Sequence, residues 1–234
     1  MKSASAPFVI VTGAGQGVGR ATALELATVH GCSVLAISRK ADALASLTAD
    51  PAAQGRVEVL VLDLATVDAG ERLKAAVGER NVDALILNHG QLLNKPFAHI
   101  TRAELQELFT ANVFSAIGVV QALLASLANG HVVTIGSMGG FQDSSKYPGL
   151  SSYSASKAAL ACLSQCLATE FASTGPKVNC LCLGSVDTAM LRAAFPGYAS
   201  PTTPATMGAF IARFALEGHR VYNGQVLPVA LSNP

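Results

Sequence analysis

Residues 12–20 read TGAGQGVGR and directly follow a short apolar run, FVIVT, at 8–12. A glycine-rich turn between a strand and a helix lets backbone N–H groups approach a pyrophosphate at the helix N-terminus. The stretch does not fit G-x-G-x-x-G, because the sixth position counted from Gly13 is Val18; it fits T-G-x-x-x-G-x-G. The next segment, RATALELATVH, has the spacing of an amphipathic helix. The stretch therefore predicts a dinucleotide-binding turn that opens a helix near Gly17.

Short apolar runs alternate with longer helical stretches along the rest of the chain. Strands are expected at 8–12, 32–37, 57–62, 83–88, 131–136, 177–183 and 224–229. The helical stretches include 101–128 and 152–173. Continuous apolar strands separated by helices predict a parallel sheet that is covered on both faces. We therefore expect an α/β fold with a doubly wound, Rossmann-like parallel sheet of about seven strands, in a single domain over 1–234.

Composition limits the class of protein. Charged residues are 13% of the chain, against about 25% in an average domain, and hydrophobic residues are 50%. This excess of apolar residues favours a homodimer or homotetramer. The net charge of +1, without a basic run, argues against a nucleic-acid or membrane partner. The apolar run at 8–12 is too short for a signal peptide, and no stretch is expected to reach the ~18 apolar residues of a membrane helix, so a cytoplasmic location is expected.

Cysteine and histidine patterns do not indicate a metal site. The five cysteines form no C-x-x-C pair and have apolar neighbours; they are Cys32, Cys162, Cys166, Cys180 and Cys182. The five histidines show no ligand spacing. We expect buried thiols that pack as small apolar side chains, and no metal.

The end of the second expected strand bears on the choice of cofactor. The sequence there reads AISRKAD, with Ser38 and Arg39 and no acid before Asp42. An acid at this place holds the ribose 2′-hydroxyl of NAD, whereas an arginine favours the 2′-phosphate of NADP. The prediction is NADP(H) in preference to NAD(H); the alternative is that Arg39 only faces water at a strand end.

A phenol and an ammonium group lie four residues apart in SSYSASKAAL, at 151–160. On a helix, Tyr153 and Lys157 share one face. Ser137 ends the preceding strand in TIGSMGG, and Asn112 lies in FTANVFSA. Each residue alone has an ordinary structural explanation, such as a cap or a half-buried aromatic. Taken together and in this order, the glycine motif, Asn112, Ser137 and Y-x-x-x-K resemble the short-chain dehydrogenase/reductase family over essentially the whole chain.

The resemblance implies a set of catalytic roles. Tyr153 would exchange a proton with the substrate oxygen, and Lys157 would bind the nicotinamide ribose. Together with the positive oxidised nicotinamide, Lys157 would lower the phenol pKa from its usual value near 10. Ser137 would hydrogen-bond the substrate oxygen, and Asn112 would anchor a water in the proton relay. The expected cofactor contacts are Gly13, Gly15, Gln16, Gly17, Val18, Gly19, Ser38, Arg39, Asp63, Leu64, Asn88, Gly90, Tyr153, Lys157, Val186 and Thr188.

Some positions depart from the family pattern. The usual N-N-A-G reads LNHG, so Leu87 replaces the first Asn, and His89 is expected to pack beside the cofactor. Leu183 stands where the family has a proline. The segment MGGFQDSSKYPGLSS, at 138–152, is longer than expected and should extend the pocket rim.

The substrate is expected to be a small neutral ketone, aldehyde or secondary alcohol, because the candidate walls are mostly apolar. These are Met138, Phe141, Leu150, Met190, Leu191 and Phe195, with Leu92 and Tyr198 beside them, and a short substrate loop at about 185–206. Two alternatives to a carbonyl reductase remain. A 3-oxoacyl-carrier-protein reductase needs a basic docking patch, for which Lys95, Arg102 and Arg192 are available. A non-catalytic NADPH-binding sensor or scaffold has no need of the four catalytic residue types.

Overall fold

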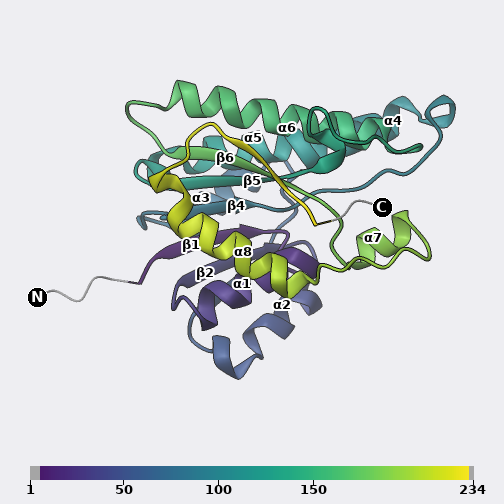
Figure 1. Cartoon of the computed structure of the whole chain (residues 1–234). Helices are drawn as coiled ribbons and strands as arrows, with labels where there is room; N and C mark the ends of the chain where they lie inside the picture. The colour runs from purple at the N-terminus through teal and green to yellow at the C-terminus, as the bar shows by residue number, and fades with distance from the viewer. Residues whose placement is uncertain (1–5, 232–234) are drawn as a thin grey trace, which may run out of the picture.

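A computed structural model describes residues 6–231, and its seven strands form one parallel sheet in the order β3-β2-β1-β4-β5-β6-β7 (Figure 1). The strands are β1 (Phe8–Thr12), β2 (Ser33–Ser38), β3 (Val57–Val61), β4 (Ala84–Leu87), β5 (His131–Ser137), β6 (Lys177–Leu183) and β7 (Val226–Val229). The predicted α/β architecture is confirmed, with strand ends displaced by one or two residues. The single domain predicted over 1–234 includes residues 1–5 and 232–234, which lie outside the described part.

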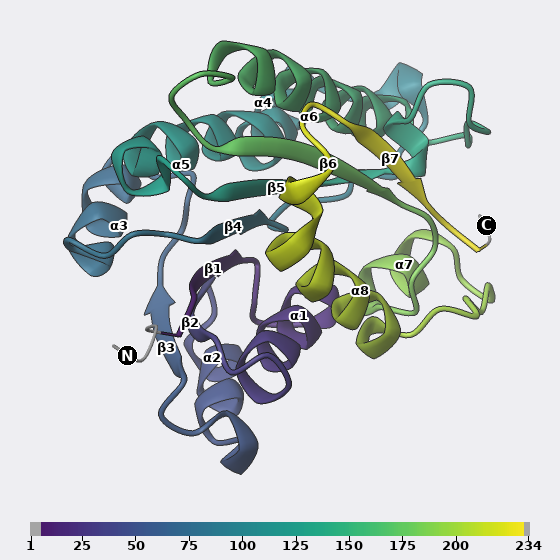
Figure 2. The ribbon, with the colours of Figure 1, turned by 60° about the vertical axis from the view of Figure 1, so that its left-hand side comes forward.

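The helices cover both faces of the sheet (Figure 2). They are α1 (Gly17–Thr28), α2 (Ala41–Thr48), α3 (Ala69–Val77), α4 (Arg102–Phe109), α5 (Ser115–Leu123), α6 (Ser151–Glu170), α7 (Ala189–Ala194) and α8 (Pro204–Glu217). Short 3-10 turns are η1 (Pro51–Ala53), η2 (Phe97–His99), η4 (Leu124–Leu127), η5 (Met138–Gly140) and η6 (Gly218–Arg220), and η3 (Thr110–Phe114) is a π turn. The expected loop at 185–206 thus contains a helix, α7.

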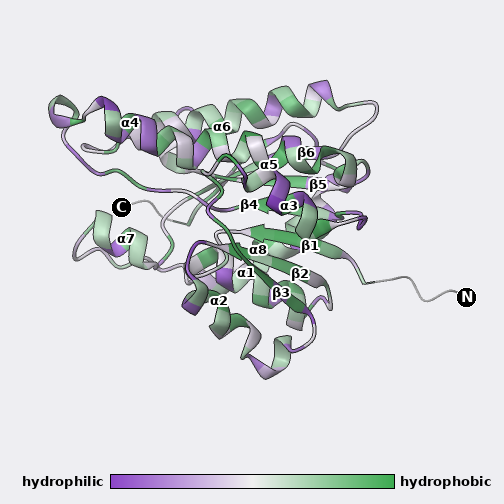
Figure 3. Ribbon diagram, turned by 180° about the vertical axis from the view of Figure 1, so that it is seen from behind, coloured by the Kyte–Doolittle hydropathy of each residue, from purple (hydrophilic) through white to green (hydrophobic). Residues whose placement is uncertain are grey.

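Alternate residues along the strands belong to two separate hydrophobic cores, one on each face of the sheet. In β1, Val9 and Val11 pack with the apolar side chains of α1 and α8, whereas Ile10 packs on the opposite face with those of α3, α5 and α6. Successive strand side chains point to opposite faces, so a strand buried on both sides must be apolar throughout. Figure 3 shows this as hydrophobic colour along the strands.

Residues 102–127 contradict one expectation from the sequence. By length and composition this helical run could cross a membrane: its mean hydropathy reaches 1.8, and 44% of that 18-residue window is buried inside the protein. One such run is weak evidence, since a core helix passes the same test. Here Val119, Val120 and Leu123 pack in the core shared with α3 and the sheet, which explains the apolar composition.

The cysteines divide into two groups. Cys32, Cys180 and Cys182 are buried as expected, but Cys162 and Cys166 are exposed. The inner face of α6 is occupied by Lys157, Leu160 and Ser164, so positions 162 and 166 lie on its outer side. Within residues 6–231, no three His, Cys, Asp or Glu residues lie close enough to hold a metal ion.

Sheet order also determines where a ligand can bind. After β3 the chain returns to pair β4 with β1, so the strand order reverses beside β1. In sheets of this kind the crevice lies at the carboxyl ends of the strands where the order reverses.

Candidate active site

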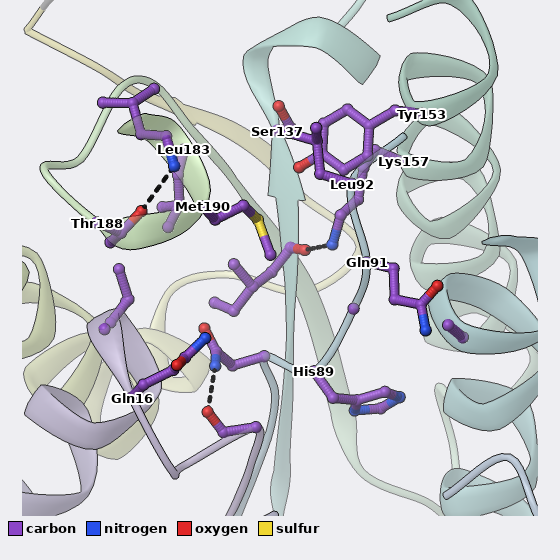
Figure 4. A pocket seen from close by; sticks show the side chains of 18 of the residues that line it. Gln16, His89, Gln91, Leu92, Ser137, Tyr153, Lys157, Leu183, Thr188 and Met190 are labelled. Carbon is purple, nitrogen blue, oxygen red and sulfur yellow. Dashed lines mark hydrogen bonds between the residues drawn. The ribbon is translucent and has the colours of Figure 1, made fainter. Parts of the chain in front are cut away.

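A cleft of about 680 Å³ lies at the carboxyl ends of the strands, and Figure 4 shows part of its lining. It brings together most of the predicted cofactor and catalytic residues, namely Gly13, Gly15, Gln16, Gly17, Val18, Ser38, Arg39, Asp63, Leu64, Asn88, Gly90, Ser137, Tyr153, Lys157, Val186 and Thr188. Of the predicted substrate walls, it includes Leu92, Met138, Leu150, Met190, Leu191 and Phe195. Gly19, Asn112, Phe141 and Tyr198 lie outside this lining.

The glycine turn is shaped by close contacts that exclude side chains. A Cβ at Gly15 would lie 2.6 Å from Ser38 Oγ, and one at Gly19 would lie 2.3 Å from Asn88 Nδ2. Asn88 Nδ2 donates to the carbonyls of Thr12 and Gly13, at 3.3 and 3.2 Å. Gly19 therefore faces Asn88 instead of the cleft, and its small size lets that amide hold the turn in place.

His89 connects the ends of two strands to a helix. Its Nδ1 lies 2.7 Å from Thr12 Oγ1, and its Nε2 lies 2.9 Å from Ser115 Oγ at the start of α5. Burial, with a smaller effect from the Lys157 charge, lowers the pKa of His89 to about 3. The ring is therefore neutral at physiological pH and lines the cleft as a structural link. Sequence reasoning missed its partner Ser115.

The outer end of the cleft is charged. Arg39 Nη1 lies 3.8 Å from Asp63 Oδ2, and both side chains are about half exposed. Lys40, at the N-terminal end of α2, also lines the cleft. Sequence reasoning missed Lys40, although the paired cations in SRK were the available signal. Two cations and one carboxylate thus stand at this rim.

The three central catalytic candidates meet at the ends of β5 and α6 (Figure 4). Lys157 is 5% exposed, and its Nζ donates to the Ile135 carbonyl at 2.8 Å. Burial lowers the pKa of Lys157 to about 8, opposed by Cys180. Burial raises the pKa of Tyr153, and a hydrogen bond with Ser137 only partly opposes this. In the chain alone, desolvation therefore dominates the pKa of Tyr153. The lowering expected from Lys157 and the oxidised nicotinamide together stays a prediction.

Asn112 is held behind the cleft. It is 1% exposed and lies in the π turn η3. Its Oδ1 accepts from the Gln91 N–H at 2.7 Å, and its Nδ2 donates to the Gln91 carbonyl at 3.0 Å and to Ser156 Oγ at 2.9 Å. The amide side chain thus fastens the segment after β4 to α6.

The predicted position of Phe141 in the substrate wall is wrong. Phe141 packs on Ala161, Cys180 and Cys182. The chain turns at Asp143, whose φ is +62°, and Ser144 Oγ donates to the carbonyls of Met138 and Phe141, which folds Phe141 inward.

Two other aromatic residues, Tyr147 and Tyr198, differ in whether they line the cleft. Tyr147, which the sequence analysis did not single out, lines the cleft and meets Phe195. The predicted wall residue Tyr198 instead pairs its hydroxyl with Ser185 Oγ at 3.1 Å.

Comparison with known proteins agrees with this geometry. A family model described as short chain dehydrogenase matches residues 7–199. The chain is 33% identical to carbonyl reductase [NADPH] 2 of Sus scrofa over 78% of this chain and 73% of that protein. It is 31% identical to an uncharacterized oxidoreductase of Staphylococcus aureus, with 81% and 82% of the two chains covered. A crystal structure of an actinorhodin polyketide ketoreductase with NADPH superposes with a TM-score of 0.86 at 26% identity and covers 98% of each chain.

The family model spans most of the chain, the two relatives match over 73% and 82% of their own length, and the ketoreductase structure matches over 98% of its length. These matches agree with the glycine turn and with the cluster of Ser137, Tyr153 and Lys157 in one cleft. The chain belongs to the short-chain dehydrogenase/reductase family of NAD(P)-dependent oxidoreductases.

Proposed function

We propose that this protein is an NADP(H)-dependent oxidoreductase that transfers a hydride between the nicotinamide and a neutral carbonyl compound or secondary alcohol. The observation that carries the proposal is the cluster of Ser137, Tyr153 and Lys157, which lines the cleft at the ends of β5 and α6. There, the Tyr153 phenol shares a hydrogen bond with Ser137, and Lys157 is held one helical turn away in the same cleft as the glycine turn.

The cleft residues fit a nicotinamide dinucleotide. Gly13 and Gly17 have φ of +65° and +56°, and the turn they form opens the 12-residue helix α1, whose N-terminus suits a pyrophosphate. Asp63 and Leu64 would hold the adenine, and Thr188 and Val186 the nicotinamide amide. When bound, the dinucleotide supplies or accepts the hydride.

The charged rim supports NADP(H). Arg39 and Lys40 stand beside Ser38 where an adenosine 2′-phosphate would lie. Their charges suit a phosphate, and the guanidinium can bind it through two N–H groups. The Arg39–Asp63 pair is long, at 3.8 Å, and half exposed, so it contributes little and Arg39 is free to turn toward a phosphate.

The protonation states support reduction at neutral pH. Because the pKa of Tyr153 is raised, its phenol keeps the proton that a ketone oxygen needs. Ser137 would donate a second hydrogen bond to that oxygen. Lys157, with a pKa of about 8, is mostly charged at pH 7 and would offset the negative charge left on Tyr153 after proton transfer.

The walls support a free, neutral substrate. The cleft lining includes several apolar side chains suited to such a substrate, among them Leu92, Met138, Leu150 and Leu191. Docking of an acyl-carrier protein has little support, because Lys95 is paired with Glu104 at 2.7 Å and Arg192 with Asp187. A catalytically idle sensor would not need the cluster at the ends of β5 and α6.

We also propose a homodimer or homotetramer. Leu105, Phe114 and Leu124 are 36–56% exposed along α4, η3 and η4, and an apolar strip of this kind is suited to a subunit interface. Light scattering of the purified protein tests this; a monomer at micromolar concentration would contradict it.

The enzymatic proposal is tested by NADPH oxidation over a panel of neutral ketones and aldehydes, with wild type and Tyr153→Phe. The variant keeps the ring and removes the proton, so turnover should be abolished while NADPH binding, followed by fluorescence, is retained. Near-wild-type turnover in Tyr153→Phe would refute the role of Tyr153, and no oxidation with any carbonyl would refute the proposed activity.

A further inference from the structure

The substrate end of the cleft is closed by two aromatic rings from different segments. Tyr147 lies in the segment between η5 and α6, and Phe195 lies just after α7; both line the cleft. Their ring centroids are 5.7 Å apart and their planes meet at 78°. An edge-to-face pair of this kind leaves further ring surface available for a third aromatic group.

Hydrogen bonds from the segment after β4 hold the two segments that carry this pair. Asn94 Nδ2 donates to the Ala194 carbonyl at 2.9 Å, and Lys95 N–H donates to the Gly149 carbonyl at 2.9 Å. Gly149 has a φ of +82°, and a Cβ there would lie 2.1 Å from Asn94 Oδ1. The segment after β4 therefore hydrogen-bonds to both segments that carry the two rings. The two rings are thus held in place before any substrate binds.

Two thioethers line the same cleft as this ring pair. Met138 and Met190 line the cleft, and Figure 4 shows the Met190 side chain extending into it, toward the side where Ser137 and Tyr153 lie. Sulfur makes favourable contacts with aromatic rings, and methionine adapts to the shape of a flat ligand. An aliphatic substrate would need only the leucines of this pocket, whereas a ring would also use both thioethers and both aromatic side chains.

We infer that the substrate is a ketone or aldehyde that carries an aromatic ring, with the ring held against Tyr147, Phe195 and Met190 and the carbonyl oxygen at Ser137 and Tyr153. This inference rests on the proposed function and adds the substrate class. In the reaction, the carbonyl carbon gains the hydride and its oxygen gains the Tyr153 proton, so the carbonyl is reduced to an alcohol while NADPH is oxidised to NADP⁺.

The test uses a matched pair of ketones, benzylacetone and its ring-hydrogenated analogue. Neither carbonyl is conjugated to the ring, so the two differ in aromatic character and not in intrinsic reactivity. We expect kcat/KM to favour benzylacetone by about tenfold in the wild type, since ring–ring and ring–thioether contacts each contribute a few-fold. Tyr147→Leu and Phe195→Leu, which keep apolar bulk, should each reduce the preference several-fold.

Phe97→Leu is the matched control. Phe97 is 78% exposed and lies outside the cleft lining, so the same chemical change there should leave the preference unaltered. Equal kcat/KM values for the two ketones in the wild type would overturn the inference even if a variant failed to fold. A preference that persists in both ring variants would do the same. Loss of NADPH oxidation with every carbonyl tested would instead refute the proposed function.

Discussion

Acid should destabilise this protein in part through a buried histidine at the opposite end of the strands from the cleft. His131 begins β5 and is fully buried. Its Nδ1 donates to the Ala215 carbonyl at 2.9 Å, so its Nε2 accepts from Asn179 Nδ2, also at 2.9 Å. Asn179 cannot reverse its amide without losing the bond that its Oδ1 accepts from the Gln225 N–H at 3.0 Å. A protonated ring would therefore face an N–H group with no acceptor.

The magnitude follows from the difference in pKa between the folded and unfolded states. Burial lowers the pKa of His131 to about 4, against about 6.5 in an unfolded chain. Between these values the unfolded state binds more protons, so the stabilising contribution is complete above the upper value and is lost as pH falls toward the lower one. At about 1.4 kcal/mol per pKa unit, His131 accounts for a loss of about 2 kcal/mol between pH 7 and pH 5.

The measurement is urea unfolding of wild type and His131→Gln at both pH values. Gln keeps an acceptor for Asn179 but cannot titrate, so the variant should be less stable at pH 7 and should lose about 2 kcal/mol less than wild type on acidification. The pKa values of His89 and His219 are also lowered, and both residues are present in both proteins, so their own titrations cancel to first order in the comparison. Parallel pH dependence in the two proteins would refute the reasoning.

Three further predictions concern the cleft. Arg39→Ala should weaken NADPH binding about tenfold and leave NADH binding nearly unchanged, since only NADPH carries the 2′-phosphate; equal losses in a fluorescence titration would contradict the assignment. The rate of ketone reduction should fall as pH rises through about 8, because Lys157 then loses its charge; a profile that stays level well above pH 8 would contradict this. Gly19→Ala should cost about 1–3 kcal/mol in urea unfolding, because its Cβ would lie 2.3 Å from Asn88 Nδ2. The control Gly118→Ala, with no atom of another segment within 4 Å of the new Cβ, should be neutral or stabilising; similar losses in both variants would argue against the contact.

The fold was predictable because its inner strands β1, β2, β4, β5 and β6 are buried on both faces, which demands continuous apolar runs such as FVIVT at 8–12. The ordered motifs likewise placed Ser137, Tyr153 and Lys157 in one cleft. The surroundings of Asn112 were not predictable, because they depend on contacts between distant segments. The π turn at Asn112 follows from bonds to Gln91 and Ser156, and nothing in FTANVF itself interrupts a helix.

The substrate wall was less predictable because the local backbone conformation decides it. Phe141 turns inward because Asp143 adopts a positive φ and Ser144 folds the segment back on itself, which no apolar pattern signals. The fall of the Lys157 pKa, and the rise of the Tyr153 pKa, follow from burial depth. Spacing on a helix reports which groups are neighbours, but it does not report how much water they lose.

The apolar run at 102–127 has a consequence for synthesis of the chain. On the ribosome it emerges before β5 and β6, which extend the sheet, and before α6, which packs in the same core. Until those elements are made, only α3 and the first four strands can shield it. The growing polypeptide therefore passes through a stage at which this apolar run is not covered by the rest of the protein. A translational pause soon after residue 127 would lengthen the time during which chaperones can bind the run or it can be inserted into a lipid bilayer by mistake.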